Sequence, residues 1–155
     1  MNILFQPYLR KFVIVFFDDI LVYSKSLEDH ILHLEIVFQC LMTNQFFLKR
    51  TKCLLAQESI EYLGHIISRD GVSPDPEKIR AMVAWPAPTN VKQLCGFLGL
   101  TGFYRKFVKH YASIAAPLTN LLKKDSFTRS EEAQQSFDHL KDAMTHTPVL
   151  ILPNF

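Results

Sequence analysis

Two adjacent aspartates, Asp18 and Asp19, interrupt an otherwise apolar stretch that runs from Phe12 to Tyr23. The β-branched and aromatic residues on both sides favour extended backbone, so the stretch predicts two strands with the aspartates at or near the turn between them. Two carboxylates about 5 Å apart repel each other by roughly 3 kcal/mol at an effective dielectric constant near 20. Apolar flanks add a desolvation cost.

Two interpretations of this pair follow. The carboxylates can hold a divalent cation, and oxygen ligands suit Mg²⁺ or Mn²⁺. Alternatively, the segment is a solvated turn that happens to contain two aspartates. Because Asp18→Asn removes one charge from an apolar hairpin, we expect it to leave the fold intact and to stabilise the metal-free chain by roughly 0.5–2 kcal/mol.

Length and composition set broad limits. With 155 residues and 48% apolar content, the chain can form one domain or two small ones. The 17 Lys and Arg residues against 15 Asp and Glu give a net charge of +2, which is too small to indicate nucleic-acid binding by itself. The basic residues nevertheless cluster locally, at Arg10-Lys11, Lys49-Arg50-Lys52, Arg105-Lys106-Lys109-His110 and Lys123-Lys124.

The three cysteines are odd in number and far apart in sequence, a pattern that favours reduced thiols in an intracellular compartment. The sequence has neither an apolar run of roughly 20 residues nor a signal-peptide pattern, so we expect a soluble protein. Both a nuclear and an organellar location remain open.

The first half of the chain predicts one helix and several strands. Ser26 starts a helix to about Asn44. Its apolar stripe is Leu27, Ile31, Leu34, Phe38 and Leu41. Extended pieces are expected at 46–49, 53–56 and 60–68, followed by a turn at 69–71 in which Gly71 has a positive φ. We expect these strands and the pair around Asp18 to share one small sheet, with the helix on one face.

The second half predicts four helices and a terminal strand. Asp75 caps a helix that ends near Ala84, and Asn90 caps the next, whose apolar stripe reaches Phe107. Further helices are expected at 113–123 and, after Ser130, at 131–145. A strand at 148–152 has no visible partner in the sequence.

Several ordered motifs together resemble the reverse transcriptase (RNA-directed DNA polymerase, a nucleotidyltransferase) of gypsy-like long-terminal-repeat retrotransposons. The motifs are Phe16-Phe17-Asp18-Asp19 with its continuation to Ser24, the helix with His30 and His33, Lys52-Cys53, Tyr62 to Ser68, Pro74 to Ile79, Trp85 to Pro88, Gly96 to Leu100, Phe103-Tyr104-Arg105, Gln134 to Lys141 and Pro148 to Phe155. The resemblance implies an α+β fold. Residues 1–72 would be the C-terminal part of the polymerase palm, 73–125 a helical thumb, and 126–155 the start of a connection toward a ribonuclease H domain.

The resemblance also assigns roles to residues. Polymerases of this class use two divalent ions. Asp18 and Asp19 would be the catalytic residues and ligands of Mg²⁺ or Mn²⁺, and Phe16 and Phe17 would contact the primer terminus. The implied primer grip is Leu63, Gly64 and His65, and the implied contacts to the nucleic-acid backbone are Arg105, Lys106 and Lys109. The expected partner is a primer–template duplex, RNA/DNA or DNA/DNA, and no membrane is expected.

Departures from the family pattern limit these expectations. The family's second metal-binding aspartate lies upstream of the position of Met1, as do the fingers, and the ribonuclease H portion would follow Phe155. Cys95 stands where the family usually has Arg, and Arg129 where it usually has Trp. We therefore expect a polyprotein fragment with an incomplete catalytic site, little or no metal binding and no activity alone. A nucleic-acid-binding remnant and a non-functional transposon-derived open reading frame are the alternatives.

Overall fold

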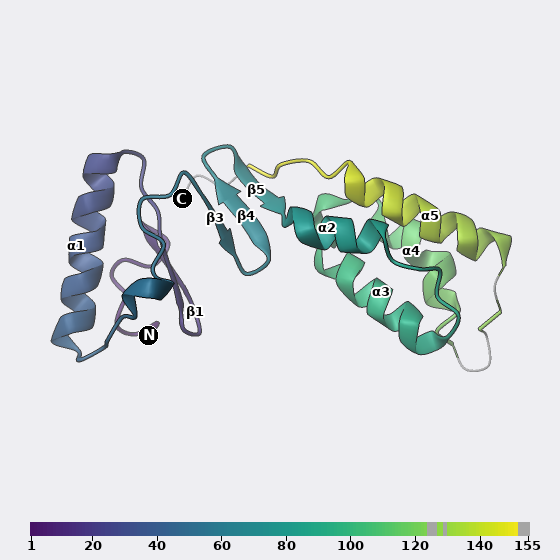
Figure 1. The fold of residues 1–155 in the computed structure, drawn as a ribbon, viewed down its shortest axis with the longest axis horizontal. Helices are drawn as coiled ribbons and strands as arrows, with labels where there is room; N and C mark the ends of the chain where they lie inside the picture. Colours follow the sequence, from purple (N-terminus) through teal and green to yellow (C-terminus); the bar gives the residue numbers. More distant parts are fainter. Residues whose placement is uncertain (124–126, 129, 152–155) are drawn as a thin grey trace. The chain divides into compact units, whose positions relative to one another are not determined.

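The computed structural model describes residues 1–123, 127–128 and 130–151, which form two compact units (Figure 1). The first unit comprises Met1–Ile60 and the second begins at Glu61. Helices and small antiparallel sheets occur together, so the fold class is α+β, as predicted. No helix in the described part of the chain is long and apolar enough to cross a membrane.

The first unit is a β-hairpin with a helix packed against it. Strand β1 (Val13–Phe16) pairs antiparallel with β2 (Asp19–Val22), and helix α1 (Leu27–Thr43) follows. As predicted, the Ser26 side chain caps α1 by accepting a hydrogen bond from the Asp29 amide. A 3₁₀ turn, η1, covers Arg50–Lys52. The buried residues at the centre of this unit are Phe5, Phe12, Val13, Val37 and Leu41.

The buried face of α1 matches the predicted stripe only in part, at the half-buried Leu34 and the buried Leu41. Val37 and Leu41 are buried, whereas Leu27, Ile31 and Phe38 of the predicted stripe are exposed. The helix carries apolar residues around more than half of its circumference, so periodicity alone does not identify the face that meets the hairpin. Residues 46–49 and 53–56, predicted as extended pieces, belong to no strand.

Within the described residues, the strands form two sheets rather than the single sheet that was predicted. The second sheet is a meander of β3 (Ser59–Tyr62), β4 (His65–Ser68) and β5 (Gly71–Pro74). Gly71 has the predicted positive φ, at 132°. The segment at 148–152 was predicted to lack a partner, but Val72 and Leu150 exchange two backbone hydrogen bonds of 2.8 Å. Leu152 lies outside the described residues.

Four helices and a 3₁₀ turn complete the second unit (Figure 1). They are α2 (Pro76–Val83), α3 (Val91–Phe103), η2 (Arg105–Phe107), α4 (Tyr111–Asn120) and α5 (Glu131–Thr145). The predicted caps Asp75, Asn90 and Ser130 all accept a backbone hydrogen bond. The predicted start of α4 at Ser113 is wrong, because the helix begins at Tyr111, directly after the N-cap His110, which has a φ of 59°.

The helices enclose two buried clusters. One lies among α3, α4 and α5 and is formed by Leu94, Phe97, Ala115, Leu118, Ala133, Phe137 and Leu140. The other is formed by Met82, Tyr104, Phe107, Val108 and Met144. The Lys141 ammonium donates a 2.7 Å hydrogen bond to the Trp85 carbonyl, which attaches α5 to the segment after α2. Val72 of β5 packs against the second cluster, which places the C-terminal end of α3 beside the sheet of the same unit.

Candidate functional site

The two aspartates occupy different positions at the tip of the β1–β2 hairpin. Phe16 pairs with Asp19 in the ladder, so Phe17 and Asp18 form the two-residue turn and Asp19 is the first residue of β2. Phe17 has a φ of 51°. A left-handed conformation costs a non-glycine residue roughly 1–2 kcal/mol, and such strain concentrates at functional sites.

Both carboxylates and both phenylalanines at this tip are accessible. Asp18 and Asp19 are exposed, so the desolvation that the apolar flanks predicted does not occur. Phe17 is 80% exposed and meets Phe16 edge-on, with ring centroids 4.8 Å apart. An open depression beside them is lined by Met1, Asn2, Val15, Phe16, Phe17 and Asp18. The turn therefore presents the Asp18 carboxylate and two aromatic rings together at an open depression.

The carboxylates fit a divalent cation only in part. Their oxygens are the ligand type that Mg²⁺ and Mn²⁺ prefer. In the parts of the chain that the structure describes, no group of three or more His, Cys, Asp or Glu side chains could hold a metal ion. Among the described residues, Asp18 and Asp19 therefore form at most two carboxylate ligands and not a complete metal site.

A second candidate site is the turn between β3 and β4 in the second unit. Leu63 and Gly64 form this turn, with φ of 52° and 74°. His65 begins β4, and its Nδ1 lies 2.9 Å from the Leu63 carbonyl oxygen. The three residues predicted as a primer grip are therefore adjacent in one tight turn, with Leu63 38% exposed.

The turn is attached to the C-terminal end of α3. The Tyr104 hydroxyl donates a 2.5 Å hydrogen bond to the Gly64 carbonyl oxygen. Burial raises the pKa of Tyr104, and the nearby carboxylates of Asp75 and Glu61 raise it further, so the hydroxyl keeps its proton at neutral pH. Tyr104 was not among the site residues predicted from the sequence, although its place in the motif Phe103-Tyr104-Arg105 was a signal.

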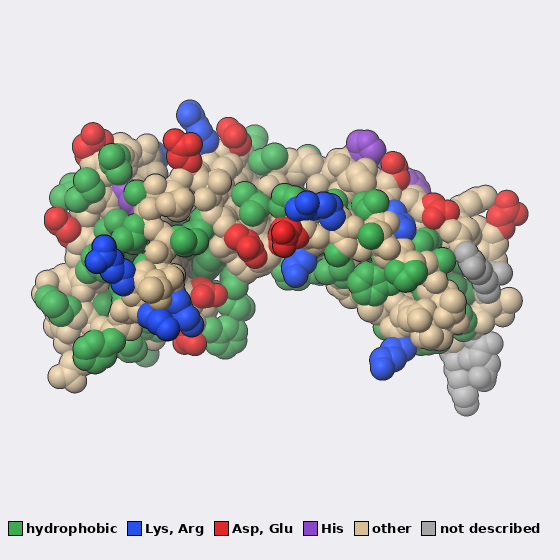
Figure 2. Space-filling model, in the orientation of Figure 1, with side chains coloured by type: hydrophobic (Ala, Val, Ile, Leu, Met, Phe, Trp, Pro, Cys, Tyr) green, Lys and Arg blue, Asp and Glu red, His purple; other side chains and the backbone are tan. Residues whose placement is uncertain are grey.

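The basic residues predicted to contact nucleic acid lie directly after Tyr104. Arg105, Lys106 and Lys109 are exposed, in and just beyond η2. On the face seen in Figure 2, Lys and Arg side chains are spread among acidic and hydrophobic ones rather than gathered in one large patch. Lys123 is exposed, and Lys124 lies outside the described residues.

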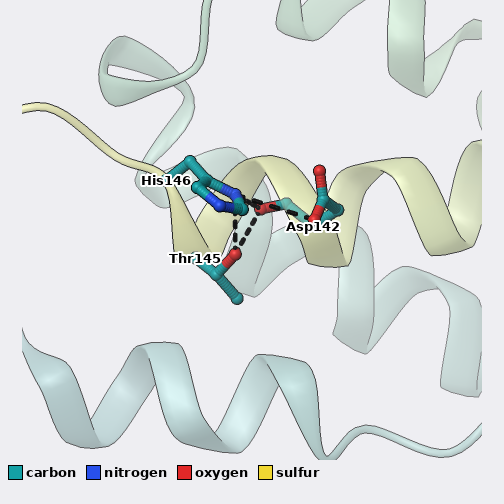
Figure 3. A network of polar contacts seen from close by, with 3 residues as sticks. All are labelled: Asp142, Thr145 and His146. Atoms are coloured by element: carbon teal, nitrogen blue, oxygen red, sulfur yellow. Dashed lines mark hydrogen bonds and ion pairs between the residues drawn. The ribbon is translucent and has the colours of Figure 1, made fainter.

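Other polar groups have structural explanations. Asp142, Thr145 and His146 form a contact network at the C-terminal end of α5 (Figure 3), in which the Thr145 hydroxyl donates a 2.7 Å hydrogen bond to the Asp142 carbonyl. Ser24 contacts the Nδ1 atoms of His30 and His33 at 3.1 and 2.8 Å. Cys95 is an exposed free thiol, and Arg129 lies outside the described residues.

Comparisons with known proteins place these features in a family. Residues 1–67 match the profile of the family "Reverse transcriptase (RNA-dependent DNA polymerase)". The Retrovirus-related Pol polyprotein from transposon 297 of Drosophila melanogaster is 40% identical over 157 residues, which cover 100% of this chain and 15% of the polyprotein. An uncharacterized mitochondrial protein of Arabidopsis thaliana is 53% identical over 124 residues, covering 79% of this chain and 78% of that protein.

The chain belongs to the retrotransposon reverse transcriptase family. A foamy viral protease–reverse transcriptase, solved in complex with double-stranded DNA, has the same fold, with a TM-score of 0.85 and 24% identity over 97% of this chain and 27% of that one. Because the chain spans about 15% of the transposon polyprotein it matches, it corresponds to a fragment of a reverse transcriptase polyprotein.

Proposed function

We propose that this chain carries part of a polymerase active site and a primer grip, and that it binds primer–template nucleic acid without synthesising DNA by itself. Residues 1–72 would then be the C-terminal part of the palm, 73–125 the thumb and 126–155 the start of the connection. Phe155 and the rest of 152–155 lie outside the described residues. The whole reverse transcriptase would supply the templated chemistry.

The observation that carries this proposal is the tip of the β1–β2 hairpin. Asp18 and Asp19 are exposed beside two exposed phenylalanines, at a turn whose Phe17 has a strained φ of 51°. A two-residue hairpin turn commonly requires a residue with positive φ, and phenylalanine is a costly choice there, because glycine, asparagine and aspartate adopt this conformation with less strain. The aspartates would contribute oxygen ligands to Mg²⁺ or Mn²⁺, and Phe16 and Phe17 would pack against the primer terminus.

Binding is supported by the relatives and by the exposed cations. Foamy viral protease–reverse transcriptases with this fold were solved with double-stranded DNA and with an RNA/DNA hybrid. In this chain, Arg105, Lys106 and Lys109 are exposed and closely spaced beyond α3. Cations of this kind bind phosphates with little sequence preference and with a strong dependence on salt.

Primer extension tests the chemical half of the proposal. Purified protein should incorporate no nucleotides on an RNA or DNA template with Mg²⁺ or Mn²⁺, because the groups of such a site act as a unit and a further carboxylate is needed. Template-dependent incorporation that Asp18→Ala abolishes would contradict the expected inactivity and show that another residue completes the site.

Fluorescence anisotropy with a labelled primer–template duplex tests the binding half. Affinity should fall steeply with salt, and a variant with Arg105, Lys106 and Lys109 changed to Gln should have a shallower slope, by about 0.9 per lost phosphate contact. The matched control changes Lys49, Arg50 and Lys52 to Gln, which removes the same charge from the first unit. Absence of binding at low salt, or an equal effect of the control, would refute the proposal.

A further inference from the structure

The turn between β3 and β4 adopts a conformation that its own residues do not favour. Both Leu63 and Gly64 have positive φ, as type I′ hairpin turns require. Glycine accepts this conformation readily, but it costs a leucine roughly 1–2 kcal/mol. Leu63 is also 38% exposed, so burial of its side chain offsets only part of this cost. Contacts from outside the turn must hold it.

Two groups from the helical part of the unit hold the Gly64 carbonyl. The Tyr104 hydroxyl donates at 2.5 Å, and the Asp75 amide donates at 3.3 Å. Tyr104 lies at the C-terminal end of α3 and Asp75 is the N-cap of α2, so the turn is attached to both helices. Tyr104 is 1% exposed, which shields its hydrogen bond from competing water.

The His65 side chain, which follows the turn, packs on aromatic residues around Tyr104. The His65 ring lies 5.2, 5.5 and 5.7 Å from the rings of Phe103, Tyr104 and Phe107. A Cβ atom at Gly64 would lie 3.3 Å from the Tyr104 hydroxyl oxygen, so the close approach depends on glycine. Next to this aromatic group in sequence, Arg105 and Lys106 are exposed. Tyr104 therefore connects the turn with the start of the basic segment.

We propose that Tyr104 is a positioning residue, whose hydroxyl fixes the Leu63-Gly64-His65 turn and the Arg105-Lys106 segment as one rigid surface that binds the nucleic-acid backbone. This inference rests on the proposed function, since it assigns a role within the same binding surface. Tyr104 itself is buried and would not touch the nucleic acid.

The test compares two substitutions that delete the same atom. Tyr104→Phe removes the hydroxyl that holds the turn. Tyr111→Phe is the matched control, because the Tyr111 hydroxyl lies in the same unit but contacts the Thr101 hydroxyl, at 2.9 Å. Each variant of the 155-residue chain is examined by amide hydrogen exchange and by anisotropy with a labelled primer–template duplex.

Tyr104→Phe should speed exchange at the amides of β4 and Asp75 selectively and weaken duplex binding by about 2- to 10-fold, the range for one hydrogen bond. Tyr111→Phe should leave both the exchange rates of these amides and the duplex affinity unchanged. Unchanged binding and unchanged exchange in Tyr104→Phe would overturn the inference, as would an equal loss of binding in both variants, which would indicate general destabilisation. If the wild-type protein binds no duplex, the proposed function itself fails, and the positioning role fails with it.

Discussion

Gly64 and Gly99 should respond to substitution by alanine in opposite directions. Gly64 has a φ of 74°, and an added Cβ would lie 3.3 Å from the Tyr104 hydroxyl oxygen and 3.5 Å from a Phe103 ring carbon. Gly99 lies inside α3, and an added Cβ there would meet no atom within 4 Å. The two positions therefore separate strain at a turn from the general effect of adding a methyl group.

The magnitudes follow from three contributions. A left-handed conformation costs alanine roughly 1–2 kcal/mol at position 64, and displacement of the Tyr104 hydroxyl weakens a hydrogen bond with a net value of about 0.5–1.5 kcal/mol. Restriction of the unfolded chain offsets about 0.4–1 kcal/mol of this. Gly64→Ala should thus destabilise the second unit by about 0.5–3 kcal/mol. Gly99→Ala should stabilise it by about 0.5–1 kcal/mol, because alanine is the better helix residue.

Trp85 provides a selective assay, since it is the single tryptophan of the chain and belongs to the second unit. Its ring lies 6.3 Å from that of Phe97 in the buried cluster, so its fluorescence should change when this unit unfolds. Urea denaturation followed at Trp85 should place the two variants on opposite sides of the wild type. A Gly64→Ala midpoint at or above the wild-type midpoint would refute the reasoning about the turn.

Two further predictions concern the first unit, where hydrogen exchange of the α1 amides reports stability. Because Asp18 is exposed, Asp18→Asn in chelator should change the free energy of unfolding by no more than about 0.5 kcal/mol; a gain above about 1 kcal/mol would show that the pair is desolvated after all. The Tyr23 hydroxyl is buried and has no hydrogen-bond partner in the described structure. Tyr23→Phe should therefore leave the free energy of unfolding unchanged or raise it by up to about 1 kcal/mol. A clear loss of stability would reveal a partner for the hydroxyl.

Helix boundaries were largely predictable because their signals are local. Ser26, Asp75, Asn90 and Ser130 cap the helices that follow them, as their side chains indicated. A cap acts on amides two or three residues away, so its effect needs no knowledge of the rest of the fold. His110 carries no such signal, and the start of α4 was accordingly placed two residues too late.

Non-local arrangement was not predictable from the same patterns. The turn at Leu63-Gly64 does not have a favoured hairpin sequence, and its Gly64 carbonyl accepts a hydrogen bond from Tyr104, which is distant in sequence. The division of the strands into two sheets likewise depends on which strands pair, and the strand propensity of each segment does not specify its partner. At the candidate site, the aspartates were found from sequence, but their exposure was not, because apolar neighbours in sequence need not be neighbours in space.

The pairing of Val72 with Leu150 has a consequence for synthesis of the chain. Until Leu150 leaves the ribosome, the outer edge of β5 has unpaired backbone groups that another extended segment could bind. The helices between the two residues form from contacts nearer in sequence and can fold first. Gly71 is essential to this late step, because a Cβ there would lie 2.2 Å from the Leu150 carbonyl oxygen. A side chain at position 71 would leave the edge open and favour aggregation of newly made chains.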